Sequence, residues 1–356
     1  MNWYYDENYL AARAYAMAEK QRETADFKML LFFLAITVII ETLVTQVAAG
    51  IVFTILPTSP DHPNWDVFIL GLEAGNSLMS GEDFAYLLMW LANDIVMYIP
   101  PLIIFGIVFG IVFHRRMDYT RPVTPYLFKY IWVFPLFLAG YALATGSSML
   151  SERIANIISL IFGGGDGLPD VFAEVMPVSN VQMLVMFFTV GIVAPVCEEI
   201  IYRHILLKPL RRFGDLQAVV ITSVLFGFFH GNLTQFLYTT VIGFILGVTA
   251  VRANSVVPAI IIHMLNNIFI LLNSYFYDML DTMPEFAETG LNFIIGATLL
   301  LGIAALIYMI KKGYLTVDNH HPHLSPAERR QIIATRPSII VMTIILVLLT
   351  LLGTLL

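Results

Sequence analysis

Long apolar segments constrain the fold of this 356-residue chain more than any other feature. Several of them reach the roughly 20 residues that a helix needs to cross about 30 Å of hydrocarbon, and they are spread along the whole sequence. Hydrophobic residues make up 58% of the chain and charged residues only 13%, so there is more apolar surface than a soluble domain buries. The sequence therefore predicts an all-α, polytopic transmembrane helical bundle.

Hydropathy along the chain predicts about nine spans. They lie at 29–56, 84–113, 126–148, 181–207, 216–231, 235–251, 256–275, 290–310 and 338–356. Spans 216–231 and 235–251 are short, and we expect them to cross a thinner region or to fold inside the bundle around a polar site. The predicted divisions are an N-terminal cytoplasmic segment (1–28), N-terminal transmembrane helices (29–180), a core of four helices (181–275) and C-terminal transmembrane helices (276–356).

Lysine and arginine are distributed unevenly between the connections. Because basic residues near span ends stay on the cytoplasmic side, their positions predict orientation. They gather at His114 to Arg116 with Arg121, at Lys208 with Arg211 and Arg212, at Arg252, at Lys311 and Lys312, and at Arg329 and Arg330. Segments 57–83 and 276–289 contain neither residue type. We therefore expect an integral multi-pass protein of the cell membrane, with a cytoplasmic N-terminus and an external C-terminus.

Charge and cysteine content exclude several classes of function. The net charge of −7 argues against nucleic-acid binding, which needs a concentrated basic surface. Cys197 is the sole cysteine, which excludes an intrachain disulfide and a cysteine-rich metal cluster. A lone cysteine in an apolar helix packs as a small hydrophobic residue, so we do not assign Cys197 as a nucleophile.

Three polar clusters interrupt the apolar spans. They are Cys197 to Arg203, Phe226 to His230 and His263 to Asn267, on three different predicted helices. A charged side chain inside a membrane costs several kcal/mol unless it is paired or hydrated, so each cluster predicts a functional site. Glu41 and Asp94 also fall inside spans, and we interpret them as packing or oligomer contacts because no partner pattern accompanies them.

A depth estimate predicts that these clusters can meet. Glu198 lies ten residues before Lys208, which at 1.5 Å per residue is about 15 Å from that surface. His263 lies eleven residues after Arg252, or about 16 Å. The agreement favours one shared site within the membrane.

Spacing within each cluster predicts which side chains share a helix face. Glu199 and Arg203 are four residues apart and are expected to pair in a supporting ion pair. Glu198, about 100° away around the helix, is then free to face another partner. Phe226 precedes His230 by one turn, where an aromatic ring would exclude water and hold the imidazole.

Peptide hydrolysis is the chemistry that fits these groups best. An unpaired carboxylate such as Glu198, beside a histidine such as His230, can take a proton from water and pass it to a leaving amine. His263 and Asn267 suit the donors that stabilise an oxyanion. Alternatively, Glu198, His230 and His263 bind Zn²⁺ as three protein ligands with one open position. A zinc-dependent and a metal-free reaction both fit the sequence.

The three clusters together resemble the signature of the CAAX protease and bacteriocin-processing (CPBP, or Abi) family of type II CAAX prenyl endopeptidases. Its pattern is Glu-Glu-x-x-x-Arg, then Phe-x-x-x-His, then His-x-x-x-Asn. All seven positions match, at Glu198, Glu199, Arg203, Phe226, His230, His263 and Asn267. The resemblance covers about 180–275 and implies an intramembrane peptidase with a four-helix core. It further implies that Glu198 and His230 activate water and that His263 and Asn267 stabilise the oxyanion.

The resemblance implies a peptide or lipidated-protein substrate in the bilayer but leaves the substrate, the metal dependence and the oligomeric state open. The alternative is a non-enzymatic transporter or scaffold that uses Glu198 and the two histidines as a proton or cation site. Broken or repeated helices would favour transport, and the sequence has no internal repeat.

Overall fold

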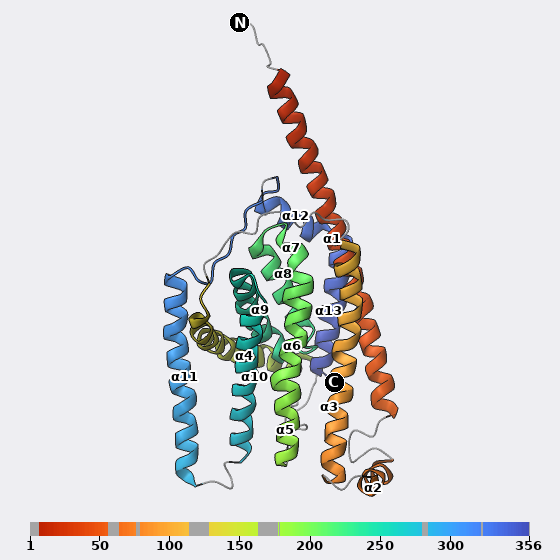
Figure 1. Ribbon diagram of the computed structural model, residues 1–356, viewed down its shortest axis with the longest axis vertical. Coiled ribbons are helices and arrows are strands. Elements are labelled where there is room, and N and C mark those ends of the chain that lie inside the picture. The colour runs from red at the N-terminus through yellow and green to blue at the C-terminus, as the bar shows by residue number, and fades with distance from the viewer. Residues whose placement is uncertain are drawn as a thin grey trace.

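The computed structural model describes residues 7–55, 64–75, 79–113, 128–162, 177, 179–279, 284–321 and 323–355. Every regular element in these ranges is a helix, which confirms the all-α prediction. Most helices run along the long axis of the molecule, and the N-terminal part of α1 (Glu7–Ile55) projects beyond the others (Figure 1). Eight helices of the described part are long and apolar enough to cross a membrane. The chain is an integral, multi-pass membrane protein.

After α1, the chain forms a succession of helices. In order they are α2 (Trp65–Gly75), α3 (Gly81–Phe105), the π-helix η1 (Gly106–Phe113), the 3₁₀ turn η2 (Tyr130–Trp132), α4 (Val133–Phe162), α5 (Asn180–Phe188), the π-helix η4 (Thr189–Val193), α6 (Ala194–Glu199), the π-helix η5 (Ile200–Leu206), α7 (Leu207–Arg211), α8 (Asp215–Phe228), α9 (Leu233–Ala253), α10 (Val257–Asp278), α11 (Glu285–Lys311), α12 (Pro326–Thr335) and α13 (Pro337–Leu355). From α5 to α7 the backbone continues as one apolar span, Asn180–Arg211, which we call the central rod.

The predicted span 216–231 is the helix that is too short to cross a membrane. It corresponds to α8, whose 14 residues extend about 21 Å. α8 packs along α9, and Arg211 at the start of this hairpin donates a hydrogen bond to the Asn254 side chain at its end, at 3.3 Å. The hairpin therefore opens at one end of the bundle and closes at residues 229–232, inside the roughly 30 Å of hydrocarbon.

Several predicted boundaries were wrong. α1 begins at Glu7, so residues 7–28 are helical and continue directly into the first span. α4 extends to Phe162, so residues 149–162, predicted as a connection, are helical. The reason is that Leu150, Ile154, Ile157 and Ile161 continue the apolar repeat of the helix. α2 and α12 also lie in segments predicted as loops, and Ser325 starts α12 in a capping box with Glu328.

Four packed elements enclose the interior of the bundle. The central rod contacts α8 and α10, and α9 packs against both of those helices. α4 covers α9 and α10 and also contacts α11, whereas α1 packs against α3 and α13. Phe213, Phe226 and Leu246 are among the fully buried side chains of this core. The arrangement brings all three predicted polar clusters into one interior.

The end of the bundle that holds Lys208, Arg211 and Arg212 is called here the basic end. Arg212 pairs there with Glu23 at 3.2 Å and with Asp26 at 2.9 Å, which fixes α1 against the rod. The basic residues predicted at 114–116 and 121 lie outside the described residues.

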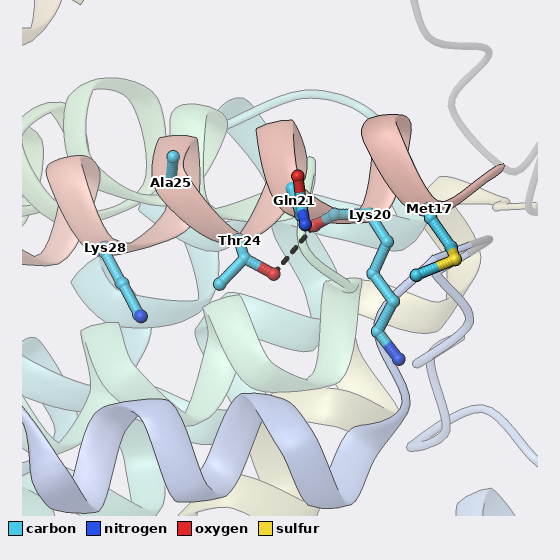
Figure 2. Close-up of a pocket in the computed structure, with 6 residues that line it drawn as sticks. All are labelled: Met17, Lys20, Gln21, Thr24, Ala25 and Lys28. Carbon is cyan, nitrogen blue, oxygen red and sulfur yellow. Dashed lines mark hydrogen bonds between the residues drawn. The ribbon is translucent and has the colours of Figure 1, made fainter. Parts of the chain in front are cut away.

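A groove of about 480 Å³ follows the N-terminal part of α1 and is lined by Met17, Lys20, Gln21, Thr24, Ala25 and Lys28 (Figure 2). Since no residue of the polar clusters lines it, this groove is separate from the candidate site.

Candidate active site

Glu199 and Arg203 form a fully buried ion pair, as their spacing predicts. Arg203 Nε lies 3.2 Å from Glu199 Oε2, and both side chains are 0% exposed. Arg203 Nη2 also donates to the carbonyl oxygen of Gly243 at 3.0 Å, and its guanidinium lies 4.6 Å from the centre of the Phe226 ring. The pair neutralises one carboxylate in the interior and joins the rod to α9.

His263 joins the two glutamates, so the predicted meeting of α6 and α10 is confirmed. Its Nδ1 lies 3.0 Å from Glu199 Oε1, and its Nε2 lies 3.7 Å from Glu198 Oε2. Because a carboxylate only accepts hydrogen bonds, the geometry places a proton on Nδ1. The Nε2 edge of the ring then faces Glu198, and the side chain is only 4% exposed.

Glu198 differs from Glu199 in both exposure and partners. Its side chain is 17% exposed, and no lysine or arginine in the described part of the chain forms an ion pair with it. Tyr98 on α3 donates a hydrogen bond to Oε1 at 3.1 Å, while Oε2 faces His263. The carboxylate is therefore reachable and has an oxygen able to accept a proton.

His230 lies in a turn and not on a helix, which corrects the prediction for the second cluster. α8 ends at Phe228, and Gly231 adopts φ +73°, a left-handed conformation that lets the chain reverse into α9. His230 Nδ1 donates to the carbonyl oxygen of Phe226 at 2.8 Å, so Nε2 is the nitrogen left for another partner. The imidazole also interacts electrostatically with Glu198.

Phe226 lies between the two histidines. Its ring centre is 4.9 Å from that of His230 and 5.7 Å from that of His263, edge-on in both cases. Gly243 on α9 faces this ring, and a Cβ there would lie 3.1 Å from Phe226 Cδ1 and 3.3 Å from Arg203 Nη2. The close approach of α9 therefore depends on the absence of a side chain at position 243.

Asn267 reaches a different element from the other cluster residues. Its Nδ2 donates to the carbonyl oxygen of Val190 at 3.0 Å, in the π-helix η4. π-helical turns often occur at functional sites, and here η4 and η5 flank α6 with its two glutamates. A side-chain amide has two N–H donors, and this bond uses one of them.

Two residues of the site were missed by the sequence analysis. Gly243 has no signal beyond its position in an apolar helix. Tyr98 follows Asp94 by four residues, and this polar pair on one face of a span was the available signal. Glu41, in contrast, is buried within the chain and accepts a hydrogen bond from Thr45 at 3.0 Å, so it is a packing residue and not an oligomer contact.

Among the described residues, no group of three or more His, Cys, Asp or Glu side chains is placed to hold a metal ion. Glu198, His230 and His263 are therefore not gathered around one point as a zinc site in this arrangement. Zinc dependence stays a prediction.

Comparison with known proteins agrees with this geometry. The profile of the family described as type II CAAX prenyl endopeptidase Rce1-like matches residues 180–269, from the start of α5 into α10. This segment carries the seven motif residues. This part of the chain is thus similar to the CAAX protease family. The resemblance seen in the sequence motifs is thus confirmed.

One relative extends the comparison beyond the family profile. The chain is 27% identical over 165 residues to a protein of Bacillus subtilis (strain 168) named "Putative membrane peptidase YdiL". The alignment covers 46% of this chain and 64% of that protein, which is less than two thirds of its length. No solved structure matches the chain.

Proposed function

We propose that this chain is an intramembrane endopeptidase that hydrolyses peptide bonds of membrane-associated peptides or lipidated proteins. The observation that carries the proposal is Glu198, a carboxylate with no lysine or arginine partner in the described residues, which faces His263 Nε2 within the helical core. A charged side chain inside the membrane is costly in free energy, so its presence there favours a functional role. The family match and the relative's name support a membrane peptidase at a coarser level.

Glu198 is the general base in this mechanism. Its carboxylate takes one proton from a water molecule, and the water oxygen attacks the carbonyl carbon of the scissile peptide bond. His230, whose Nδ1 proton is committed to the Phe226 carbonyl, presents Nε2 as an acceptor for the second hydrogen of that water. The two residues together orient the attacking oxygen.

His263 and Asn267 stabilise the negative charge that moves onto the carbonyl oxygen. Asn267 offers the amide N–H that is not used by Val190. His263 donates from Nε2 when that nitrogen is protonated, and the Glu199 carboxylate on Nδ1 stabilises the resulting cation. Preorganised donors of this kind contribute about 3–4 kcal/mol each in a dry site.

The tetrahedral intermediate collapses when the C–N bond breaks. The proton that Glu198 took from water passes to the leaving nitrogen, so the amine departs neutral and the carboxylate of Glu198 is restored. One water is consumed, and one new acid and one amine are formed. Glu199 and Arg203 take no proton in this scheme and hold His263 in place.

The orientation and metal dependence belong to the same proposal. We expect the N-terminus and the basic end to face the cytoplasm, with the chain in the cell membrane, because basic residues are retained on that side. If the reaction uses Zn²⁺, then Glu198, His230 and His263 would have to move together from the arrangement described above before they could hold it, and the ion would supply Lewis-acid activation of water.

Cleavage of a peptide library by purified, reconstituted protein tests the function. The library contains prenylated CAAX peptides and bacteriocin-type leader peptides, and mass spectrometry detects the products. Wild-type protein is compared with Glu198→Ala and with the control Glu152→Ala, which alters an exposed glutamate of α4. Each is assayed with and without a chelator.

We expect cleavage by wild type and by the control, and a loss of at least about 100-fold in Glu198→Ala, as for removal of a general base. Activity that survives chelation supports the metal-free reaction, and activity lost on chelation supports zinc. Equal cleavage by Glu198→Ala and wild type would refute the assigned base. Absence of any cleavage would favour the transporter or scaffold.

A further inference from the structure

Tyr98 contacts the proposed base from a helix outside the family segment. It lies on α3, about 80 residues before the matched residues begin, and its hydroxyl donates to Glu198 Oε1 at 3.1 Å. We propose that Tyr98 is a positioning residue for Glu198, a role that rests on the proposed peptidase function. The active site would then require α3 in addition to the four-element core.

The two oxygens of Glu198 have different neighbours. Oε1 is held by the Tyr98 hydroxyl, whereas Oε2 lies 3.7 Å from His263 Nε2. The terminal torsion of a glutamate side chain is broad, so a free carboxylate would sample many orientations. A directional bond at Oε1 restricts that torsion. It follows that Oε2 is the oxygen presented to the water and to His263.

The contact belongs to a continuous interface and is not an isolated encounter. α3 packs against α5, α6 and η5 along the central rod. Near the start of both helices, Ser179 Oγ donates to Asp83 Oδ1 at 2.6 Å, and further along Tyr86 Oη lies 3.6 Å from Met186 Sδ.

These contacts join residues 96 to 100 positions apart in the sequence, and Tyr98 and Glu198 are again 100 apart. Two parallel helices that pack side by side give such a nearly constant difference in residue number between contacting residues. The register therefore fixes which residue of α3 reaches Glu198. A shift of one residue would rotate Tyr98 about 100° away from the rod.

The residues around Tyr98 favour a functional reading over simple packing. Asp94 lies one turn earlier on the same helix and interacts electrostatically with Glu198, so two carboxylates lie on this side of the site. Their repulsion pushes the Glu198 carboxylate away from Asp94. A hydroxyl donor at Oε1 opposes this repulsion, which a phenylalanine of nearly the same shape cannot do.

Kinetics of Tyr98→Phe test this role. We expect kcat to fall at least tenfold, which corresponds to about 1.4 kcal/mol in the barrier, while KM stays within twofold of wild type. Tyr86→Phe removes a hydroxyl of α3 that contacts Met186 of the central rod, away from Glu198, and is the matched control, with kcat and KM unchanged. A kcat within twofold of wild type in Tyr98→Phe would overturn the proposal.

A stability cycle keeps this test separate from the proposed function. Thermal unfolding is measured for wild type, Tyr98→Phe, Glu198→Ala, which removes the acceptor, and the double variant. We expect the double variant to lose less stability than the sum of the single losses, because both remove the same bond. If wild type cleaves nothing but this coupling is present, the peptidase proposal fails and the contact stands. Additive losses would overturn the contact itself.

Discussion

Replacing Arg203 by methionine is the change whose effect on stability the structure predicts most directly. Methionine keeps an unbranched stem but removes the cation that pairs with Glu199 at 3.2 Å. Both side chains are 0% exposed, so water cannot replace the lost partner. We therefore expect Arg203→Met to leave an uncompensated charge in the interior and to lower the free energy of unfolding.

The size of this loss follows from the contacts. Removing one partner of a buried pair costs about 3–5 kcal/mol. The Nε and Oε2 atoms lie close together but without the alignment of a hydrogen bond, which favours the lower end of that range, about 3 kcal/mol. Loss of the bond to the Gly243 carbonyl adds about 1 kcal/mol. The expected total for Arg203→Met is about 4 kcal/mol.

Reversible unfolding in mixed detergent micelles, followed by circular dichroism, measures the effect. The double variant Arg203→Met with Glu199→Gln removes both charges, and we expect it to recover about 1–3 kcal/mol relative to the sum of the single losses. Arg22→Met is the control, because Arg22 pairs with Glu19 at 3.9 Å and is 71% exposed. It should change stability by less than about 0.5 kcal/mol.

Two results would refute this reasoning. One is a loss below about 1 kcal/mol in Arg203→Met, comparable to that of an exposed pair. The other is strict additivity of the Arg203 and Glu199 substitutions. Either result would mean that Arg203 does not stabilise the buried charge of Glu199.

Three further predictions concern neighbouring features. Gly243→Ala should lower the free energy of unfolding by about 1–3 kcal/mol and lower the cleavage rate, because its Cβ would lie 3.1 Å from Phe226 Cδ1. The unfolding and cleavage assays described above measure the two effects. Phe226→Leu should keep the fold but reduce kcat more than it raises KM, since it removes the ring between the two histidines, and steady-state kinetics measures this. Hydrogen bonds from Lys20 and Ser325 lower the pKa of Glu328 from 4.5 to about 2. The stabilisation of α12 by this carboxylate is therefore complete above pH 4.5 and is lost as the pH falls toward 2. Hydrogen exchange of α12 measures this change, and Glu328→Gln should remove the pH dependence.

Local spacing predicted the parts of the site that lie within one or two turns. The pairing of Glu199 with Arg203 follows from a separation of four residues on a helix. The approach of His263 to Glu198 followed from equal depths below basic residues, because helix rise converts sequence distance into position within a membrane. Only the second inference uses the membrane as an external frame.

Sequence spacing could not predict contacts between distant segments. Tyr98 and Glu198 are 100 residues apart, and only the register of α3 on the central rod brings them together. The need for glycine at position 243 depends on how closely α9 approaches Phe226, which no local pattern encodes. Likewise, His230 lies in a turn because Gly231 reverses the chain, although apolar periodicity alone continues through this point.

The initial rate of peptide cleavage by Glu198→Gln, relative to wild type, tests the central claim most directly. Glutamine keeps the shape of the side chain and can still accept a hydrogen bond from Tyr98, but it cannot take a proton from water. With both proteins folded and reconstituted in the same vesicles, we predict a rate at least about 100-fold below wild type. A Glu198→Gln rate within a few-fold of wild type would contradict the assignment of Glu198 as the base.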